Sequence, residues 1–258
     1  MVYKFKFTAI PIILFIITVS FTKDSFKEEQ KKYQRVKQAY EEKESLILDM
    51  LNKHSISTNE LEIYLRAFKA EKELELWAKN KTDKKFKFIQ NYPICKTSGI
   101  VGPKRKQGDG QIPEGCYYIS WFNPQSKFHL SLKINYPNLS DKILGYKGNL
   151  GGDIFIHGKC ATIGCIPITD DKIKELYVFC VEAKEHGQKK IPVTIFPTKL
   201  NSDNYAFLQE KYASNADNLN LWEDLKDIYD HFEQNKQLAL YKISDTGRYE
   251  IKSKVQNK

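Results

Sequence analysis

The chain has 258 residues, of which 41% are hydrophobic and 28% charged, a composition that indicates a globular protein rather than a disordered one. Its formal net charge of +9 favours an anionic partner such as a nucleic acid, an acidic lipid or a carboxylate-bearing polymer, and it fits a lysine-rich solvated surface equally well. Because the sequence has no RNA- or DNA-reading motif and no basic stripe interleaved with aromatic residues, we expect no nucleic-acid partner.

The N-terminal segment has the pattern of an export signal. Lys4 and Lys6 precede a largely apolar run from Phe7 to Phe21, which is shorter than the roughly 20 residues needed to span a bilayer. The candidate cleavage motif "TVS" lacks the usual alanines. The alternative to a cleaved signal is therefore an uncleaved anchor that contacts the membrane. We therefore expect an exported protein, in the periplasm or elsewhere in the cell envelope, with residues 1–22 as signal peptide or anchor.

Residues 23–60 combine both signs of charge with apolar residues at helical spacing: Leu46, Ile47, Met50 and Leu51. This pattern predicts a helix. We interpret the segment as a helical spacer that holds the following domain off the membrane.

The central region, residues 61–200, combines strand patterns with one helix. A helix is predicted over residues 169–187, with Thr169 or Asp170 as its N-cap and Gly187 at its end. Alternating apolar residues predict strands at 73–80, 85–95, 116–122, 127–136, 153–158 and 189–197. The last region, 201–258, is predicted as a mostly helical extension with a final strand near Tyr249. The expected fold class is thus mainly β with flanking helices (α+β).

The stretch "GGDIFIHGKCATIGCIPITDD" (residues 151–171) places one histidine and two cysteines within nine residues. A metal site is the weakest of three explanations. His157, Cys160 and Cys165 offer three ligands, but zinc sites usually repeat a tight pair of cysteines, and none is present. We therefore expect no metal.

A disulfide is the second explanation. Cys160 can pair with Cys165, or with Cys95 if the two loops meet, but both pairings leave His157 and Gly164 unexplained. The third explanation, a nucleophile beside its base, uses all of them. An imidazole can deprotonate a thiol, and a glycine lets backbone N–H groups turn towards a developing oxyanion.

The segment "IHGKCATIGC", followed by "ITDDKIKELY", strongly resembles the active-site segment of L,D-transpeptidase-like proteins with a YkuD domain. Within that group it is most similar to the YafK-like branch, which has a shortened His-Gly…(Ser/Thr)-x-Gly-Cys segment. The resemblance runs from about Leu65 to Pro197. It implies a YkuD-type catalytic domain, sandwich-like or barrel-like, with one prominent helix after the catalytic cysteine.

The resemblance also implies roles for individual residues. Cys165 matches the acyl-accepting nucleophile and His157 the general base, while the Gly158 carbonyl is expected to orient the imidazole. Thr162 and Gly164 match the small positions beside the cysteine, where Thr162 is a candidate substrate contact. The amides of Gly164 and Cys165 are candidates for the oxyanion hole.

Two positions depart from the common family pattern. Ile163 and Pro167 stand where many members have a second histidine and an arginine that helps to position substrate. Other candidate substrate contacts are Lys104 and Arg105, which suit a stem-peptide carboxylate, and Tyr136, which suits a cleft wall. For Lys104 and Arg105, the competing interpretation is a solvated loop. For Tyr136, it is a tyrosine of the core.

The resemblance therefore predicts an exported cysteine acyl-transfer enzyme that acts on peptidoglycan stem peptides through a Cys165 thioester, with no cofactor. Aminolysis of the thioester would give L,D-transpeptidation. One alternative is an L,D-hydrolase of the same fold that trims stems or releases wall-bound protein. A more distant alternative is a non-catalytic peptidoglycan-binding protein.

Overall fold

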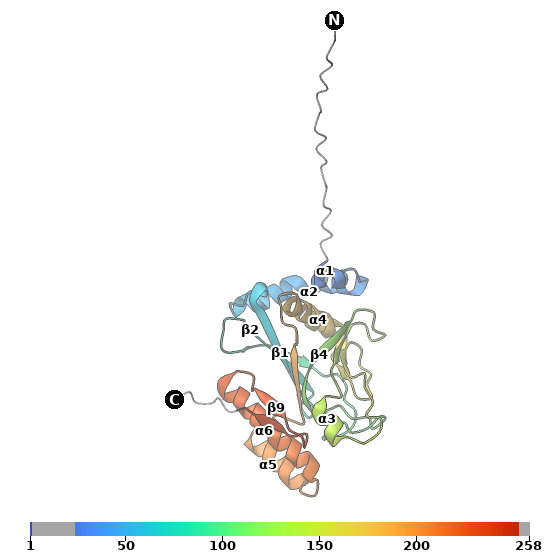
Figure 1. Ribbon diagram of the computed structural model, residues 1–258, viewed down its shortest axis with the longest axis vertical. Coiled ribbons are helices and arrows are strands. Elements are labelled where there is room, and N and C mark those ends of the chain that lie inside the picture. The colour runs from blue at the N-terminus through green and yellow to red at the C-terminus, as the bar shows by residue number, and fades with distance from the viewer. Residues whose placement is uncertain (2–23, 253–258) are drawn as a thin grey trace.

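The computed structural model describes Met1 and residues 24–252 (Figure 1). The predicted signal or anchor therefore lies, apart from Met1, outside the described residues. Within the described part, no helix is both long enough and apolar enough to cross a membrane.

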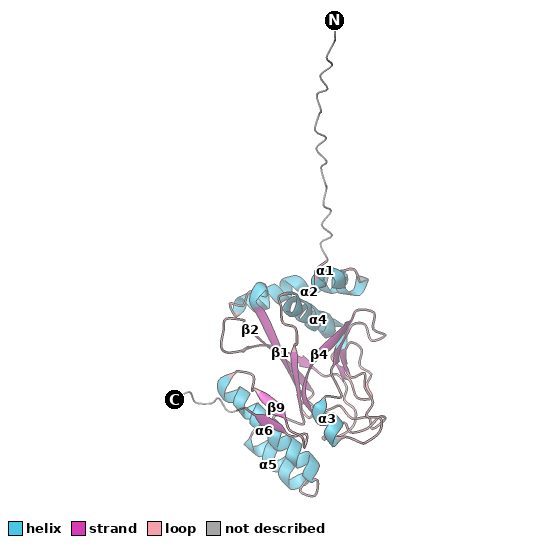
Figure 2. Ribbon diagram, viewed as in Figure 1, coloured by secondary structure: helices cyan, strands magenta, loops and turns pink. Residues whose placement is uncertain are grey.

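The described helices and strands follow one another from the N-terminal helices through a sheet to a C-terminal helical region (Figure 2). In chain order they are α1 (Phe26–Lys31), α2 (Gln34–Lys53), the 3-10 turn η1 (Thr58–Glu60), β1 (Leu61–Phe68), β2 (Glu73–Asn80), β3 (Lys87–Pro93), β4 (Gly115–Asn123), β5 (Ser131–Ile134), α3 (Leu139–Leu144), β6 (Phe155–His157), β7 (Ile166–Pro167), α4 (Thr169–Glu185), β8 (Pro192–Phe196), α5 (Ser202–Lys211), α6 (Ala216–Asn235), β9 (Tyr241–Ile243) and β10 (Tyr249–Ile251).

Among the described residues, eight strands form one mixed sheet in the order β3-β2-β1-β8-β4-β5-β6-β7. Its pairs are antiparallel except β1 with β8 and β6 with β7. The predicted α+β class with flanking helices and one prominent helix after Cys165 is confirmed. Strand β1 was not predicted, because seven of its eight residues are buried and a strand covered on both faces loses the apolar alternation.

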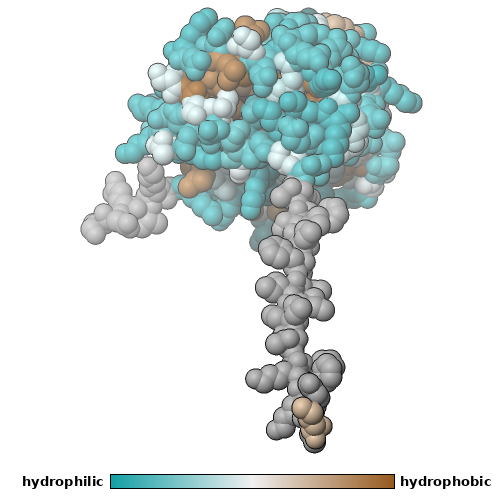
Figure 3. All heavy atoms as spheres, turned by 90° about the horizontal axis from the view of Figure 1, so that it is seen from above, coloured by the Kyte–Doolittle hydropathy of each residue, from teal (hydrophilic) through white to brown (hydrophobic). Residues whose placement is uncertain are grey.

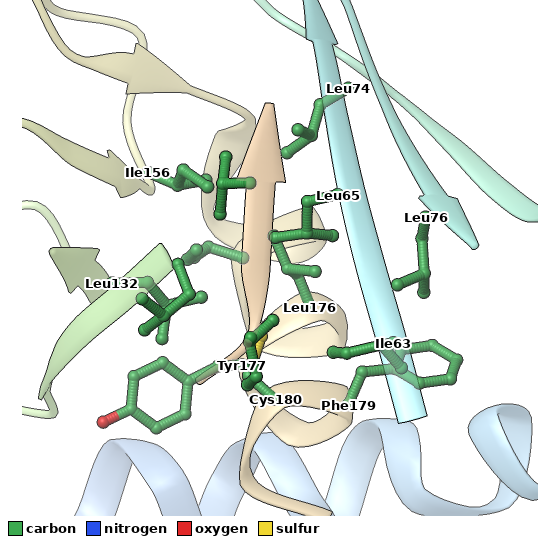
Figure 4. Close-up of a cluster of buried hydrophobic side chains, with 14 of the residues drawn as sticks. Ile63, Leu65, Leu74, Leu76, Leu132, Ile156, Leu176, Tyr177, Phe179 and Cys180 are labelled. Carbon is green, nitrogen blue, oxygen red and sulfur yellow. The ribbon is translucent and has the colours of Figure 1, made fainter. Parts of the chain in front are cut away.

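Helix α4 lies in the middle of the core. Leu176 and Phe179 pack against the sheet near Ile63 and Leu65 of β1 (Figure 4). Helices α1 and α2 cover the other side of α4 (Figure 1). This double cover explains why ten of the residues of α4 are buried, far more than a one-sided amphipathic helix would bury.

The start of α4 agrees in part with the sequence prediction. The helix begins at Thr169 with Ile168 in the N-cap position, and the Thr169 hydroxyl accepts the N–H of Lys172 at 3.4 Å. Asp170 does not cap the helix, because its carboxylate accepts the N–H of Lys159 at 2.8 Å. The first turn of α4 therefore holds the loop that follows β6.

The spacer interpretation of residues 23–60 is wrong, although the helical prediction holds. Tyr40 of α2 is buried and donates its hydroxyl to Glu182 of α4 at 2.7 Å. Four more side chains of α2 belong to the main core, and they are Val36, Ala39, Ile47 and Leu51. Seen from the side of α1 and α2, the surface is largely hydrophilic with scattered apolar patches (Figure 3).

The C-terminal region packs on the sheet through a second apolar cluster. Trp222 of α6 is fully buried and donates its indole N–H to Glu114 at 2.7 Å. Phe68 and Phe196, at the ends of β1 and β8, belong to the same cluster. The extension thus covers the end of the sheet opposite the N-terminal helices (Figure 1).

Candidate active site

Strand β6 holds His157 rigidly between two neighbouring strands. His157 lies opposite Ser131 of β5 on one side and Pro167 of β7 on the other, and only 1% of the residue is exposed. Its Nδ1 lies 2.5 Å from the carbonyl oxygen of Gly158. Because a carbonyl only accepts, this contact places a proton on Nδ1 and leaves Nε2 as the acceptor. Nε2 is buried and has no hydrogen-bond partner within residues 24–252.

The loop before Cys165 is held by Thr162. The Thr162 hydroxyl donates to the carbonyl of Cys165 at 2.7 Å and accepts the N–H of Gly164 at 3.1 Å. The Gly164 amide is therefore engaged within the loop, in contrast to its predicted oxyanion role. Gly164 has φ +131°, a backbone conformation that side chains rarely adopt, and a Cβ there would lie in tight contact, 3.1 Å from the carbonyl oxygen of Gln111, so glycine is favoured.

The imidazole and the thiol open on one pocket of about 310 Å³. The Cys165 thiol also lies 3.6 Å from the carbonyl oxygen of Asp153. The pocket is lined by Asn123, Ser126, Lys127, Phe128, Ser131, Asp153, Phe155, His157 and Cys165. A base with a free acceptor nitrogen thus shares a pocket with a thiol, without a hydrogen bond between the two, and this makes them candidates for a base and a nucleophile.

A disulfide joins Cys95 and Cys160, with their Cα atoms 5.6 Å apart. It connects the loop that carries Cys165 to the segment after β3. All five cysteines lie among the described residues, and Cys116 and Cys180 are buried, so Cys165 is the one free thiol that is partly exposed. The bridge rules out a Cys160–Cys165 disulfide and removes Cys160 from the three-ligand metal set.

Burial keeps the side chains of both His157 and Cys165 neutral near pH 7. It raises the pKa of the Cys165 thiol above its usual 9.0, and the nearby Asp153 adds to this effect, whereas a backbone hydrogen bond from Phe155 opposes it. Burial also lowers the pKa of His157 below 6.5, against the opposing effect of the Gly158 carbonyl. The resting pair is therefore thiol and imidazole, and the proton has to move when the thiol reacts.

The three predicted substrate contacts outside this segment do not line the pocket. Lys104 is buried, and its ammonium pairs with the Asp109 carboxylate at 2.7 Å. This ion pair stabilises the loop that contains both residues. The guanidinium of Arg105 forms an ion pair with Asp141, with Nη1 3.8 Å from Oδ1. Tyr136 is buried, and its hydroxyl donates to a loop carbonyl. The structure does not support a direct substrate contact by Lys104 or Tyr136.

Sequence reasoning missed Phe128 and Ser131, which the pairing of β5 with β6 brings to His157. The ring centroids of Phe128 and His157 are 4.6 Å apart. The two residues lie about thirty positions from His157 in the chain, so no local spacing links them. Asp153, which also lines the pocket, pairs its carboxylate with Lys133 at 2.6 Å.

Comparison with known proteins links this chain to one family. The profile of the L,D-transpeptidase catalytic domain, YkuD, matches residues 62–195. A protein of Escherichia coli K12 with the provisional name L,D-transpeptidase YafK is 34% identical over 191 residues, 73% of each chain.

Two solved structures show weaker similarity. The helical cell shape determining protein Pgp2 from Campylobacter jejuni aligns at 20% identity with a TM-score of 0.43, over 72% of this chain and 74% of that one. L,D-transpeptidase 1 of Mycobacterium tuberculosis aligns at 10% identity with a TM-score of 0.30, over 53% and 62%.

Proposed function

The chain belongs to the L,D-transpeptidase catalytic-domain (YkuD) family, and on this premise we propose that it is a cysteine acyl-transfer enzyme acting on peptidoglycan stem peptides. The observation that carries the proposal is the shared pocket of His157 and Cys165, in which Nε2 of the imidazole has no partner among the described residues.

In the proposed first step, Nε2 of His157 takes the proton of the Cys165 thiol as the sulfur attacks a stem-peptide carbonyl on the L-centre side of a diamino acid–D-amino acid bond. The Gly158 carbonyl holds the Nδ1 proton and so stabilises the imidazolium that forms. Because Thr162 already engages the Gly164 amide, the oxyanion role falls to the Cys165 amide. His157 then protonates the leaving amine, and a thioester remains on Cys165.

In the second step, an amine from another stem resolves the thioester and gives a cross-link. Water in the same position gives hydrolysis, which is the second candidate function, with trimmed stems or a released wall-bound protein as products. The observation that favours it is Pro167, which lies in β7 where many relatives have an arginine. Without that guanidinium, a second stem loses a positioning contact that water does not need.

We also propose that the protein is exported to the periplasm or cell envelope. The Cys95–Cys160 disulfide supports this location, because such bonds persist in oxidising compartments. Residues 1–22 would then act as the signal peptide or as an anchor that contacts the membrane. Residues 61–200 remain the proposed catalytic domain, with α2 as part of its core.

The test is mass spectrometry of muropeptides after incubation with purified peptidoglycan sacculi. The protein must include residues from 24 onward, because α2 contributes to the main core. New cross-linked or exchanged stems that disappear with Cys165→Ala would establish a transpeptidase. Shortened or unlinked stems with the same dependence would establish a hydrolase. If Cys165→Ala changes nothing, the acyl-transfer proposal is wrong and a binding role gains support.

A further inference from the structure

The loop between β4 and β5 forms the wall of the pocket beside His157. Ser126, Lys127 and Phe128 all line the pocket, and the Phe128 ring packs on the imidazole with centroids 4.6 Å apart. This ring and the Gly158 carbonyl together restrict the orientation of the imidazole. The position of the loop therefore affects how the base meets Cys165.

One side chain from the N-terminal helix holds this loop. Nη1 of Arg35, in the first turn of α2, donates to the carbonyl oxygen of Ser126 at 2.5 Å and to that of His129 at 2.7 Å. These two carbonyls lie on either side of Phe128 in the chain. The backbone of His129 has φ +70°, a region that non-glycine residues adopt only when their surroundings enforce it.

The opposite side of the loop is fastened to the segment after β6. The N–H of Gly158 donates to the carbonyl of Leu130 at 3.2 Å, and the ammonium of Lys159 donates to the carbonyl of Lys127 at 3.0 Å. A Cβ on Gly158 would lie 2.8 Å from the carbonyl oxygen of Phe128, so the two segments are in close contact. The loop is thus clamped between α2 and the catalytic segment.

We propose that Arg35 is a positioning residue, which holds Phe128 against His157 through the carbonyls of Ser126 and His129. This inference rests on the proposed function, in which His157 is the base. It gives α2 a role in catalysis as well as in the core. The backbone that carries the Arg35 side chain is held in place, because Val36 and Ala39 on the same helix are fully buried. A lysine cannot replace it fully, since its ammonium is a point charge on a flexible stem.

The pKa of His157 reports the position of Phe128 without any substrate. Burial lowers this pKa, and Phe128 is part of the cover. The other titratable or charged groups around the imidazole are Cys165 and Asp153 across the pocket, Lys127 on the loop, and Asp170 and His129 next to Gly158. Arg35→Ala removes both the support of the loop and a positive charge that lowers the pKa of His129, whereas Arg35→Lys keeps the charge and changes only the hydrogen bonds to the loop.

The experiment is an NMR titration of the imidazole resonances of the full-length chain, assigned with His157→Gln. The variants are Arg35→Ala, Arg35→Lys and Phe128→Ala, with Lys37→Ala as the matched loss of an exposed cation on the same helix. We expect Arg35→Ala and Phe128→Ala to raise the pKa of His157 towards 6.5, Arg35→Lys to raise it less, and Lys37→Ala to leave it unchanged. Thermal unfolding checks each fold, and Arg35→Lys decides the matter if Arg35→Ala does not fold.

Two results would overturn the inference. In the first, Phe128→Ala raises the pKa of His157 while both Arg35 variants match the wild type. In the second, Lys37→Ala moves the pKa as far as Arg35→Ala does. Turnover of peptidoglycan by Arg35→Ala should fall roughly tenfold, which corresponds to about 1.4 kcal/mol of lost positioning. If the wild type shows no Cys165-dependent turnover, the proposed function fails, and the titration still tests the contact.

Discussion

The carbonyl oxygen of Gly158 lies 2.5 Å from Nδ1 of His157, so the backbone of the next residue orients the imidazole. Many catalytic histidines are oriented by a carboxylate, whose negative charge also stabilises the imidazolium. A carbonyl is neutral and stabilises the imidazolium less. The Gly158 carbonyl therefore does not offset the effect of burial, which lowers the pKa of His157. His157 and Cys165 are both neutral at rest.

The neutral pair predicts slow alkylation of Cys165 at pH 7. Because burial raises the pKa of this thiol above 9.0, its reaction with iodoacetamide should be slower than that of free cysteine and should accelerate as the pH rises past 9. Mass spectrometry of the modified peptide measures the rate at each pH, with buried Cys180 as the internal control. A rate that has already reached its plateau below pH 7 would mean a preformed thiolate–imidazolium pair.

Loss of the base should abolish most of the activity without unfolding the protein. We expect His157→Gln to lower turnover of peptidoglycan by about 10²- to 10⁴-fold, the range typical of a removed general base. His54→Gln, at the end of α2 and not part of the pocket lining, is the matched control and should retain wild-type turnover. Retention of more than a tenth of the activity by His157→Gln would exclude the general-base role.

The Cys95–Cys160 disulfide should contribute to stability and to activity. It closes a loop with a sequence separation of 65 residues, and the loss of such a cross-link costs about 4 kcal/mol in the chain-entropy model. The double variant Cys95→Ser/Cys160→Ser should therefore lower the free energy of unfolding in urea by an amount of that order. Its turnover should also fall, because Cys160 lies in the loop between His157 and Cys165. Equal unfolding midpoints for variant and wild type would contradict this prediction.

Asp141 should make the fold less stable as the pH rises. It is buried beside Tyr117, and burial raises its pKa from 3.8 to about 6. The folded state thus binds more protons than the unfolded state between these values, so this contribution is complete below pH 3.8 and is lost as the pH passes 6. The loss amounts to roughly 3 kcal/mol at about 1.4 kcal/mol per pKa unit.

Asp141→Asn tests this sign, because the amide keeps an acceptor oxygen for the N–H of Asn138 and does not titrate. Urea unfolding of both proteins at pH 4 and pH 7 measures the difference. The stability of the wild type relative to the variant should decrease between these two values. An increase would show that the carboxylate is stabilised in the folded state.

Local patterns in the chain predicted many of the elements and pointed to His157 and Cys165 as the candidate pair. Alternating apolar residues predicted β2, β4 and β8, and the helix over residues 169–187 differs from α4 by two residues at its end. His157 and Cys165 were found because they share one short segment whose pattern the family repeats. Each of these signals is local, since periodicity records which face of a segment is buried.

Which segments cover those faces depends on the packing of the whole fold. Apolar periodicity does not name the partner, so the meeting of Cys95 with Cys160 and the packing of α2 on α4 were beyond it. The same limit hid β1, which is covered on both faces and so shows no alternation. Phe128 and Arg35 reach the site through strand order and helix packing, because contacts between distant segments depend on the whole fold and leave no spacing in the chain.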